Sequence, residues 1–191
     1  MIQRDILFKV LDSLDALDIP YMIIGAFASN YWGRPRMTHD ADLLVEIPPA
    51  KAATLARALQ SEFYSLDPAI EQAARLKGRT KLIHTEQAFQ VDLWMPQDAP
   101  YDRERFGRRG HGTMFDRQVW ITSVEDTILS KLLWYRSYPA SQRQFDDALE
   151  VYEIQQPYLD LAYLERWAGN LGLTDLLAQV RKQAALPLRG A

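Results

Sequence analysis

The sequence contains no cysteine, which excludes disulfide bonds, thiolate metal sites and a thiol nucleophile. Histidine is also scarce, and the histidines lack the paired spacing of a zinc-hydrolase helix. The three that are present are His39, His84 and His111. Thiol chemistry and a zinc ion held by paired histidines are therefore not expected in this protein.

Long apolar runs are missing as well, and none approaches the ~20 residues that span a bilayer. The first twenty residues mix charged and apolar side chains at helical spacing, which is unlike a signal peptide. There is no basic excess either: the net charge of -3 argues against binding nucleic acid over the whole surface, although local contacts stay open. We expect a cytoplasmic protein without a membrane partner.

The hydrophobic pattern divides the chain in two. With 191 residues, 48% of them hydrophobic, the chain suits one sizeable domain with or without a helical extension. Helices and strands mix over residues 1–120, whereas the pattern of residues 121–191 is helical throughout. We expect an α/β or α+β domain over 1–120 and a helical domain over 121–191 packed on it.

Short apolar runs bounded by turn residues predict the strands of the first domain. The expected strands are 21–26, 40–47, the hairpin 80–86 with 87–95, and an edge strand at 118–123. Arginines and glycines over 103–112 predict a mobile basic loop, which suits either a phosphate or RNA acceptor or a salt-bridged surface.

The segment GRPRMTHDADLLVEI, residues 33–47, carries the main chemical signal. Side chains two apart in a strand share a face, so Asp40 and Asp42 project together, and their like charges repel unless a cation compensates. Asp92 lies in another apolar strand, where aspartate is unfavourable. Three carboxylates on one sheet face suit two Mg²⁺ or Mn²⁺ ions, which favour phosphoryl displacement. A turn-and-cap role for the paired aspartates is the structural alternative.

A turn of small residues precedes these acids. The first strand stops at Gly25 and Ala26, and a helix is expected to follow. Small residues let a phosphate approach backbone amides, and a helix N-terminus favours negative charge. The turn is therefore a candidate binding site for a triphosphate.

Together these residues resemble the motif of the nucleotidyltransferase superfamily: a small pair, about ten residues, Asp-x-Asp, and a third carboxylate on a later strand. The matching positions are Gly25-Ala26, Asp40-Ala41-Asp42 and Asp92, with alanine at 26 where glycine or serine is commoner. The resemblance implies a mixed, mostly antiparallel sheet flanked by helices. It also implies transfer of a nucleoside monophosphate from a nucleoside triphosphate to an acceptor hydroxyl.

The likeness extends to a bacterial subgroup similar to the nucleotidyltransferase toxins of type IV toxin-antitoxin pairs. The segments that carry it are GRPRMTHDADL, ERFGRR, SVEDTILSKLLWYR, SQRQFDDALEVY and LDLAYLERWAGNLG. This resemblance implies a phosphate contact for Lys131, a place beside the active site for Arg143 and Asp147, a tRNA or protein acceptor, and a cognate antitoxin. Small antibiotic nucleotidyltransferases look similar in the first half, which keeps the acceptor open.

Nucleotide contacts are also predicted for Arg36 and Thr38, each with a structural alternative. Arg36 is equally suited to pair with a carboxylate and hold its loop, and Thr38 to begin the strand. For Lys131 the alternative is a solvated lysine on a helix. For the whole protein the alternatives are a catalytically inactive module of the same fold, which binds nucleotide or protein, and an antibiotic nucleotidyltransferase.

Overall fold

The computed structural model describes residues 3–64 and 67–185, and the chain divides into two compact units. Unit 1 comprises Met1–Phe27 and Met37–Ile121, and unit 2 comprises Ala28–Arg36 and Thr122–Ala191. The single boundary expected near residue 120 did not anticipate that the short stretch Ala28–Arg36 belongs to unit 2, whereas the residues on either side of it belong to unit 1.

Among the described residues of unit 1, six strands form one sheet in the order β3-β4-β2-β1-β6-β5. The strands are β1 (Tyr21–Ile24), β2 (Asp40–Val45), β3 (Arg79–Ile83), β4 (Gln90–Trp94), β5 (Gly110–Met114) and β6 (Arg117–Ile121). The pairs β1-β6 and β2-β4 are parallel, and the other three are antiparallel. The expected mixed, mostly antiparallel sheet is confirmed.

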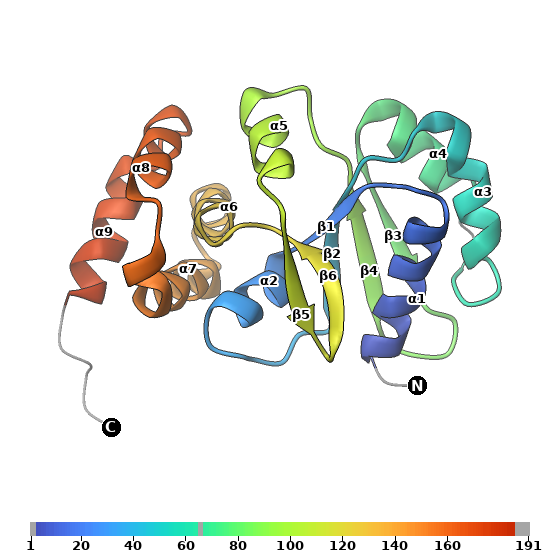
Figure 1. The fold of residues 1–191 in the computed structure, drawn as a ribbon, viewed down its shortest axis with the longest axis horizontal. Coiled ribbons are helices and arrows are strands. Elements are labelled where there is room, and N and C mark those ends of the chain that lie inside the picture. Colours follow the sequence, from blue (N-terminus) through green and yellow to red (C-terminus); the bar gives the residue numbers. More distant parts are fainter. Residues whose placement is uncertain (1–2, 65–66, 186–191) are drawn as a thin grey trace. The chain divides into compact units, whose positions relative to one another are not determined.

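Helices flank this sheet within unit 1 (Figure 1). One face is covered by α1 (Gln3–Ala16), α3 (Pro49–Leu59) and α4 (Asp67–Leu76), whereas α5 (Pro100–Gly107) lies on the other face. Alternate strand residues such as Ile23, Leu43 and Leu93 are fully buried. Since strand side chains alternate between faces, the remaining positions of β2 and β4 are left to line the opposite face, which carries the acids.

The basic stretch at 103–112 was wrongly expected to be a mobile loop. Residues up to Gly107 belong to α5, and Gly110–Met114 form β5, which pairs with β6 and lies at that edge of the sheet in place of the segment 118–123. Strand propensity alone disfavours the two glycines of β5. The hairpin instead depends on the turn residues Phe115 and Asp116, which both adopt positive φ (51° and 64°) and so match the twist of paired strands.

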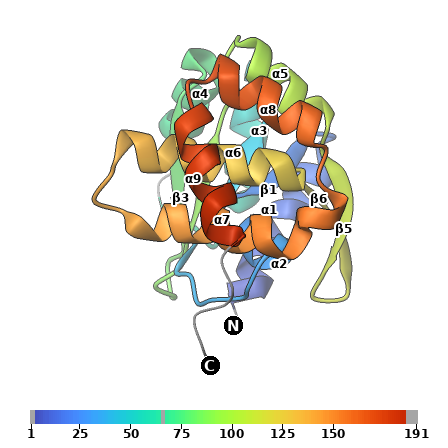
Figure 2. The ribbon, with the colours of Figure 1, turned by 90° about the vertical axis from the view of Figure 1, so that its left-hand side faces the viewer.

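Unit 2 is helical (Figure 2). After α2 (Gly25–Trp32), which begins in unit 1, it contains α6 (Val124–Ser137), α7 (Gln142–Gln155), the 3₁₀ turn η1 (Gln156–Tyr158), α8 (Leu161–Asn170) and α9 (Thr174–Ala184). Ser123 caps α6 by accepting from the Asp126 amide at 3.1 Å, and Asp160 caps α8. Ser141 makes no such bond at the start of α7.

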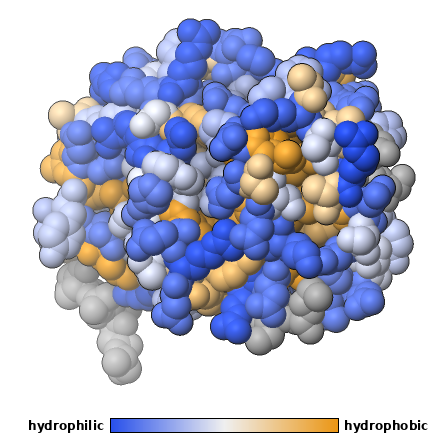
Figure 3. All heavy atoms as spheres, turned by 45° about the vertical axis from the view of Figure 1, so that its right-hand side comes forward, coloured by the Kyte–Doolittle hydropathy of each residue, from blue (hydrophilic) through white to orange (hydrophobic). Residues whose placement is uncertain are grey.

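Polar side chains cover most of the face shown in Figure 3, and hydrophobic ones appear between them in small patches. Within residues 3–64 and 67–185, helices long and apolar enough to cross a bilayer are absent.

Candidate active site

Strand register brings the three predicted carboxylates together on one face of the sheet. Asp42 of β2 is paired with Asp92 of the parallel neighbour β4, and Asp40 lies two residues before Asp42. Because paired residues of adjacent strands share a face, all three side chains project from the same side. This juxtaposition is the arrangement that the sequence predicted.

The Asp42 carboxylate lies between a tryptophan and a glycine. Its Oδ1 accepts a hydrogen bond from Trp94 Nε1 at 3.0 Å. A Cβ built on Gly25 would lie only 2.1 Å from Asp42 Oδ2, and Gly25 has a φ of +64°. Both the close approach and the left-handed backbone require glycine at this position. Asp42 is thereby held directly against the first residue of α2.

Asp92 is buried and incompletely satisfied. The residue is only 4% exposed, and its Oδ1 has no hydrogen-bond partner among the residues that the structure describes. Burial raises the pKa of Asp92, while Lys81 and Arg79 lower it and Asp40 raises it further. A buried carboxylate oxygen without a partner costs free energy, which a bound cation would offset. We take it as the clearest sign of a ligand site.

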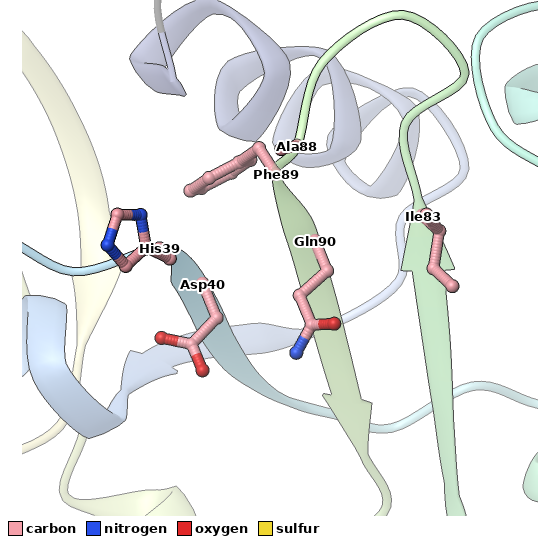
Figure 4. Close-up of a pocket in the computed structure, with 6 residues that line it drawn as sticks. All are labelled: His39, Asp40, Ile83, Ala88, Phe89 and Gln90. Atoms are coloured by element: carbon pink, nitrogen blue, oxygen red, sulfur yellow. The ribbon is translucent and has the colours of Figure 1, made fainter.

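Asp40 stands at the start of β2 beside a pocket. Its Oδ1 accepts from Thr38 Oγ1 at 2.7 Å, so Thr38 orients this carboxylate. The pocket has a volume of about 360 Å³, and Figure 4 shows Asp40 and Gln90 projecting into it from the first residues of β2 and β4. The other lining residues are His39, Ile83, Ala88 and Phe89.

The same face carries two cations on the neighbouring strand β3. Lys81 is paired with Asp92 and Arg79 with Trp94, so both side chains project beside the acids. Their nitrogens lie 3.9 Å and 3.8 Å from Asp92 Oδ2. The Arg79 guanidinium also lies over the Trp94 ring, 4.6 Å from its centroid.

Two other predicted nucleotide contacts, Arg36 and Lys131, belong to unit 2, where both bind Asp147. Arg36 forms a fork, with Nε donating to Oδ1 at 2.9 Å and Nη2 to Oδ2 at 2.7 Å, and Lys131 Nζ donates to Oδ2 at 2.6 Å. Ser29 Oγ lies 3.5 Å from the same oxygen. Asn30 fixes the backbone of Arg36 from both sides, with bonds of 2.7 and 3.1 Å.

Asp147 thus has the opposite environment from Asp92. Burial alone would raise the pKa of Asp147, but the hydrogen bond from Arg36 and the charge of Lys131 outweigh it and lower that pKa. The structural alternative for Arg36, a carboxylate partner that holds its loop, is therefore realised. Its contact with nucleotide, like that of Lys131, stays a prediction.

A complete metal cage is not preformed. Among the described residues, groups of three or more His, Cys, Asp or Glu side chains placed to hold a metal ion are absent. Magnesium in phosphoryl-transfer sites is usually bound by one or two carboxylates and completed by water and substrate phosphates. The donor set of Asp40, Asp42 and Asp92 fits an ion of that kind, and the metal role of these three residues stays a prediction.

The fold itself has known counterparts. No protein-family model matches the sequence, and no curated protein matches it at a significant level. Among solved structures, the chain is similar to an antigenic nucleotidyltransferase-like protein from Paracoccidioides brasiliensis, with a TM-score of 0.56 and 18% identity over 92% of this chain and 91% of that one. The chain has a nucleotidyltransferase fold.

Two antibiotic-modifying enzymes share this fold. The lincosamide antibiotic adenylyltransferase LnuA, solved with lincomycin, has a TM-score of 0.54 and 14% identity over 78% of this chain and 96% of its own. ANT(2")-Ia, solved with adenylyl-2"-tobramycin, has a TM-score of 0.52 and 15% identity over 95% of this chain and 98% of its own. At such identities the likeness shows the fold.

Sequence reasoning missed the residues that surround the acids. Trp94 was detectable, because it follows Asp92 by two residues in the same strand and therefore shares its face. Arg79 and Lys81 alternate in the same way, but their place opposite β4 depends on hairpin register, which the long connection leaves undefined in the sequence. Asp147 was not recognised as the common partner of Arg36 and Lys131.

Proposed function

We propose that this protein is a metal-dependent nucleotidyltransferase, which transfers a nucleoside monophosphate from a nucleoside triphosphate to an acceptor hydroxyl. The observation that supports it most strongly is the buried Oδ1 of Asp92, which has no hydrogen-bond partner within residues 3–64 and 67–185 and lies beside Asp42 and Asp40 on one sheet face. Three carboxylates that share one sheet face suit divalent cations, because their like charges repel one another.

Each residue of the site has a definite task. Asp40 and Asp42 hold the ions, and Asp92 completes one ion site and helps to accept the proton of the acceptor hydroxyl. Gly25 and Ala26, at the start of α2, leave room for the triphosphate beside the helix amides. Thr38 orients Asp40. Phosphate contacts of Arg36 and Lys131 stay predictions from the sequence, because both side chains bind Asp147 within unit 2.

The reaction balances as an in-line displacement. The acceptor oxygen forms a bond to the α-phosphorus, the bond between that phosphorus and the β-phosphate bridging oxygen breaks, and pyrophosphate leaves with the electron pair. When bound, one or two Mg²⁺ or Mn²⁺ ions supply charge neutralisation and activate the attacking hydroxyl.

The direct test is a transfer assay with purified full-length protein, Mg²⁺ and each α-labelled nucleoside triphosphate. Total tRNA, the protein itself, a cell extract and antibiotics serve as acceptors. We expect label on one acceptor class and a fall of about 10²- to 10⁴-fold in Asp92→Asn. Asp102 is a buried carboxylate in α5, and Asp102→Asn serves as the control for loss of a carboxylate outside the site. Label on no acceptor with any triphosphate would contradict the proposal.

The acceptor is proposed on two different grounds. Sequence resemblance to toxins of type IV toxin-antitoxin pairs favours tRNA or a protein and predicts a cognate antitoxin. The shared fold of LnuA and ANT(2")-Ia supports an antibiotic as the second candidate. Cells that express the chain distinguish the two candidates. Resistance to an antibiotic favours the antibiotic acceptor, and slowed growth without antibiotic favours tRNA or protein.

An inactive module of the same fold is the remaining candidate. It predicts nucleotide binding that does not require metal, whereas the enzyme predicts metal-dependent binding that is lost in Asp40→Ala and Asp42→Ala. Calorimetry with a triphosphate, with and without Mg²⁺, distinguishes these outcomes.

A further inference from the structure

The strand β3 presents two cations next to the acids, on the side away from Gly25. The sheet order β3-β4-β2-β1 places β3 and β1 on opposite sides of the acid-bearing strands. Gly25 follows β1 directly and touches Asp42, whereas Arg79 and Lys81 lie beside Asp92. The acids therefore separate the small-residue turn from a basic strand edge.

An in-line displacement places the two substrates on different sides of the acids, one on the Gly25 side and the other on the β3 side. The attacking hydroxyl and the leaving pyrophosphate must lie on opposite sides of the α-phosphorus. If the triphosphate lies beside Gly25, the acceptor approaches from the side of β3. The pocket beside Asp40 extends to the same side, because Ile83, which ends β3, and Gln90, which starts β4, both line it (Figure 4).

Arg79 and Lys81 make no direct hydrogen bond to Asp92, so pairing with this carboxylate leaves both cations available to a ligand. Their ion-pair distances of 3.8 and 3.9 Å to Asp92 Oδ2 exceed those of direct hydrogen bonds. Both side chains are 42% exposed, so their donors reach solvent. The Arg79 guanidinium lies over the Trp94 ring, and this cation–π contact holds the guanidinium in place.

We propose that Arg79 and Lys81 bind a phosphate group of the acceptor and disfavour polycationic acceptors such as aminoglycosides. This inference rests on the proposed function, since it assigns the acceptor side of that same site. Two cations at alternate strand positions face one way, and guanidinium and ammonium groups are the usual partners of phosphate oxygens. A polyamine approaching Asp92 would instead meet two like charges.

The test measures binding rather than turnover. Full-length protein is saturated with Mg²⁺ and a non-hydrolysable triphosphate analogue, then titrated with total tRNA, ribose 5-phosphate or tobramycin. The first two probes distinguish a polynucleotide from a small phosphate ester as the source of the phosphate. Arg79→Gln/Lys81→Gln is compared with Arg57→Gln/Arg75→Gln, which removes the same charge from α3 and α4 on the opposite face.

We expect the β3 double variant to weaken binding of a phosphate-bearing probe at least about tenfold, and the control double variant less than about twofold. The salt dependence of tRNA binding should fall by about one to two in log-log slope. The charge-conserving swap Arg79→Lys/Lys81→Arg should retain most of the affinity. Unaltered melting temperatures identify both double variants as folded.

Three results would overturn the inference: equal effects of the two double variants, tighter binding of tobramycin than of both phosphate probes, or no binding of either phosphate probe. Failure of the proposed function has a separate signature. If the proposed function is wrong, no acceptor leads to pyrophosphate release. The binding measurements can still succeed in that case, because they do not depend on turnover.

Discussion

Buried carboxylates have opposite environments in the acid face of unit 1 (Asp40, Asp42 and Asp92) and in the Asp147 cluster of unit 2 (Asp147, Arg36 and Lys131). Asp147 receives direct hydrogen bonds from both Arg36 and Lys131, and its pKa is lowered. Asp92 has two cations only at 3.8 Å or more, one oxygen without a partner among the described residues, and a raised pKa. One cluster is electrostatically complete and the other is not.

We interpret this difference as a structural role for Asp147 and, in line with the proposed function, a ligand-binding role for Asp92. An unsatisfied buried carboxylate oxygen costs folding free energy, so such an atom beside two further carboxylates supports the proposed cation site. A carboxylate that is already bonded to two cations holds helices and loops together. The contrast predicts opposite signs for the same chemical change, neutralisation of a carboxylate, in the two units.

The largest effect is expected for Asp147→Asn in unit 2. The substitution leaves the buried Lys131 beside a neutral partner and lowers the free energy of unfolding by about 3 kcal/mol. Because the folded-state pKa of Asp147 is lowered, its contribution is present above the ordinary value of 3.8 and is lost as the pH falls through the folded-state pKa.

Urea unfolding at pH 7 and at acidic pH measures this effect, with the exposed neighbour Asp146→Asn as the control, expected within about 0.5 kcal/mol of the wild type. Equal stability of the two variants at pH 7 would show that the Asp147 cluster is not structural.

Gly25→Ala should damage the acid face almost as severely. The new Cβ would meet Asp42 Oδ2 at 2.1 Å, and alanine is strained at a φ of +64°. We expect transfer to fall by about 10²-fold through displacement of the Asp42 carboxylate, and stability to fall by about 2 kcal/mol. Kinetics and thermal melting measure both quantities.

The matched control is Gly107→Ala, where an added Cβ meets nothing within 4 Å. Wild-type transfer in Gly25→Ala, with normal stability, would mean that the contact between Gly25 and Asp42 does not position the site.

Asp92→Asn should have the opposite sign to Asp147→Asn in metal-free protein. A raised folded-state pKa means that ionisation of Asp92 opposes folding, so its cost is absent below the ordinary value of 3.8 and grows as the pH rises through the folded-state pKa. At pH 7 without metal, the asparagine variant should melt at a higher temperature than the wild type.

Added Mg²⁺ with a non-hydrolysable triphosphate should then stabilise the wild type more than Asp92→Asn. Melting curves with chelator and with Mg²⁺ provide the measurement. A lower melting temperature for Asp92→Asn in chelator would remove the contrast between the two units.

The smallest effect is expected at the β5-β6 turn, far in sequence from the acids. Asp116 has a φ of +64°, and Asp116→Gly relieves that conformation, which should raise stability by about 0.5 kcal/mol without changing transfer. Gln118→Gly, in the extended backbone of β6, should lower it instead. A change in transfer by Asp116→Gly would show that the site depends on the hairpin.

Local patterns predicted the parts of the fold that local physics determines. Alternation placed Asp40 and Asp42 on one face, and the small turn at Gly25 was visible as the end of an apolar run. Helix periodicity over residues 121–191 predicted the helical character of unit 2, to which α6 belongs. These features depend on neighbours within a few residues.

Long-range pairing explains what the sequence did not reveal. The pairing of Asp42 with Asp92 was only a hypothesis until β2 and β4 were seen in register, because two helices and β3 intervene. The strand β5 was missed because its glycines are poor strand formers and only pairing with β6 overrides them. Asp147 lies 111 positions from Arg36, beyond any local signal.

The central claim is that the carboxylates of Asp40, Asp42 and Asp92 bind divalent cations together with a triphosphate. Crystals grown with Mn²⁺ and a non-hydrolysable triphosphate analogue, measured at the manganese absorption edge, test it most directly. The account predicts at least one anomalous peak about 2.1 Å from the triphosphate and from carboxylate oxygens of Asp40 and Asp42, with Asp92 as a further ligand of one ion. A triphosphate bound without any such peak, with Asp92 Oδ1 still unpartnered, would contradict it.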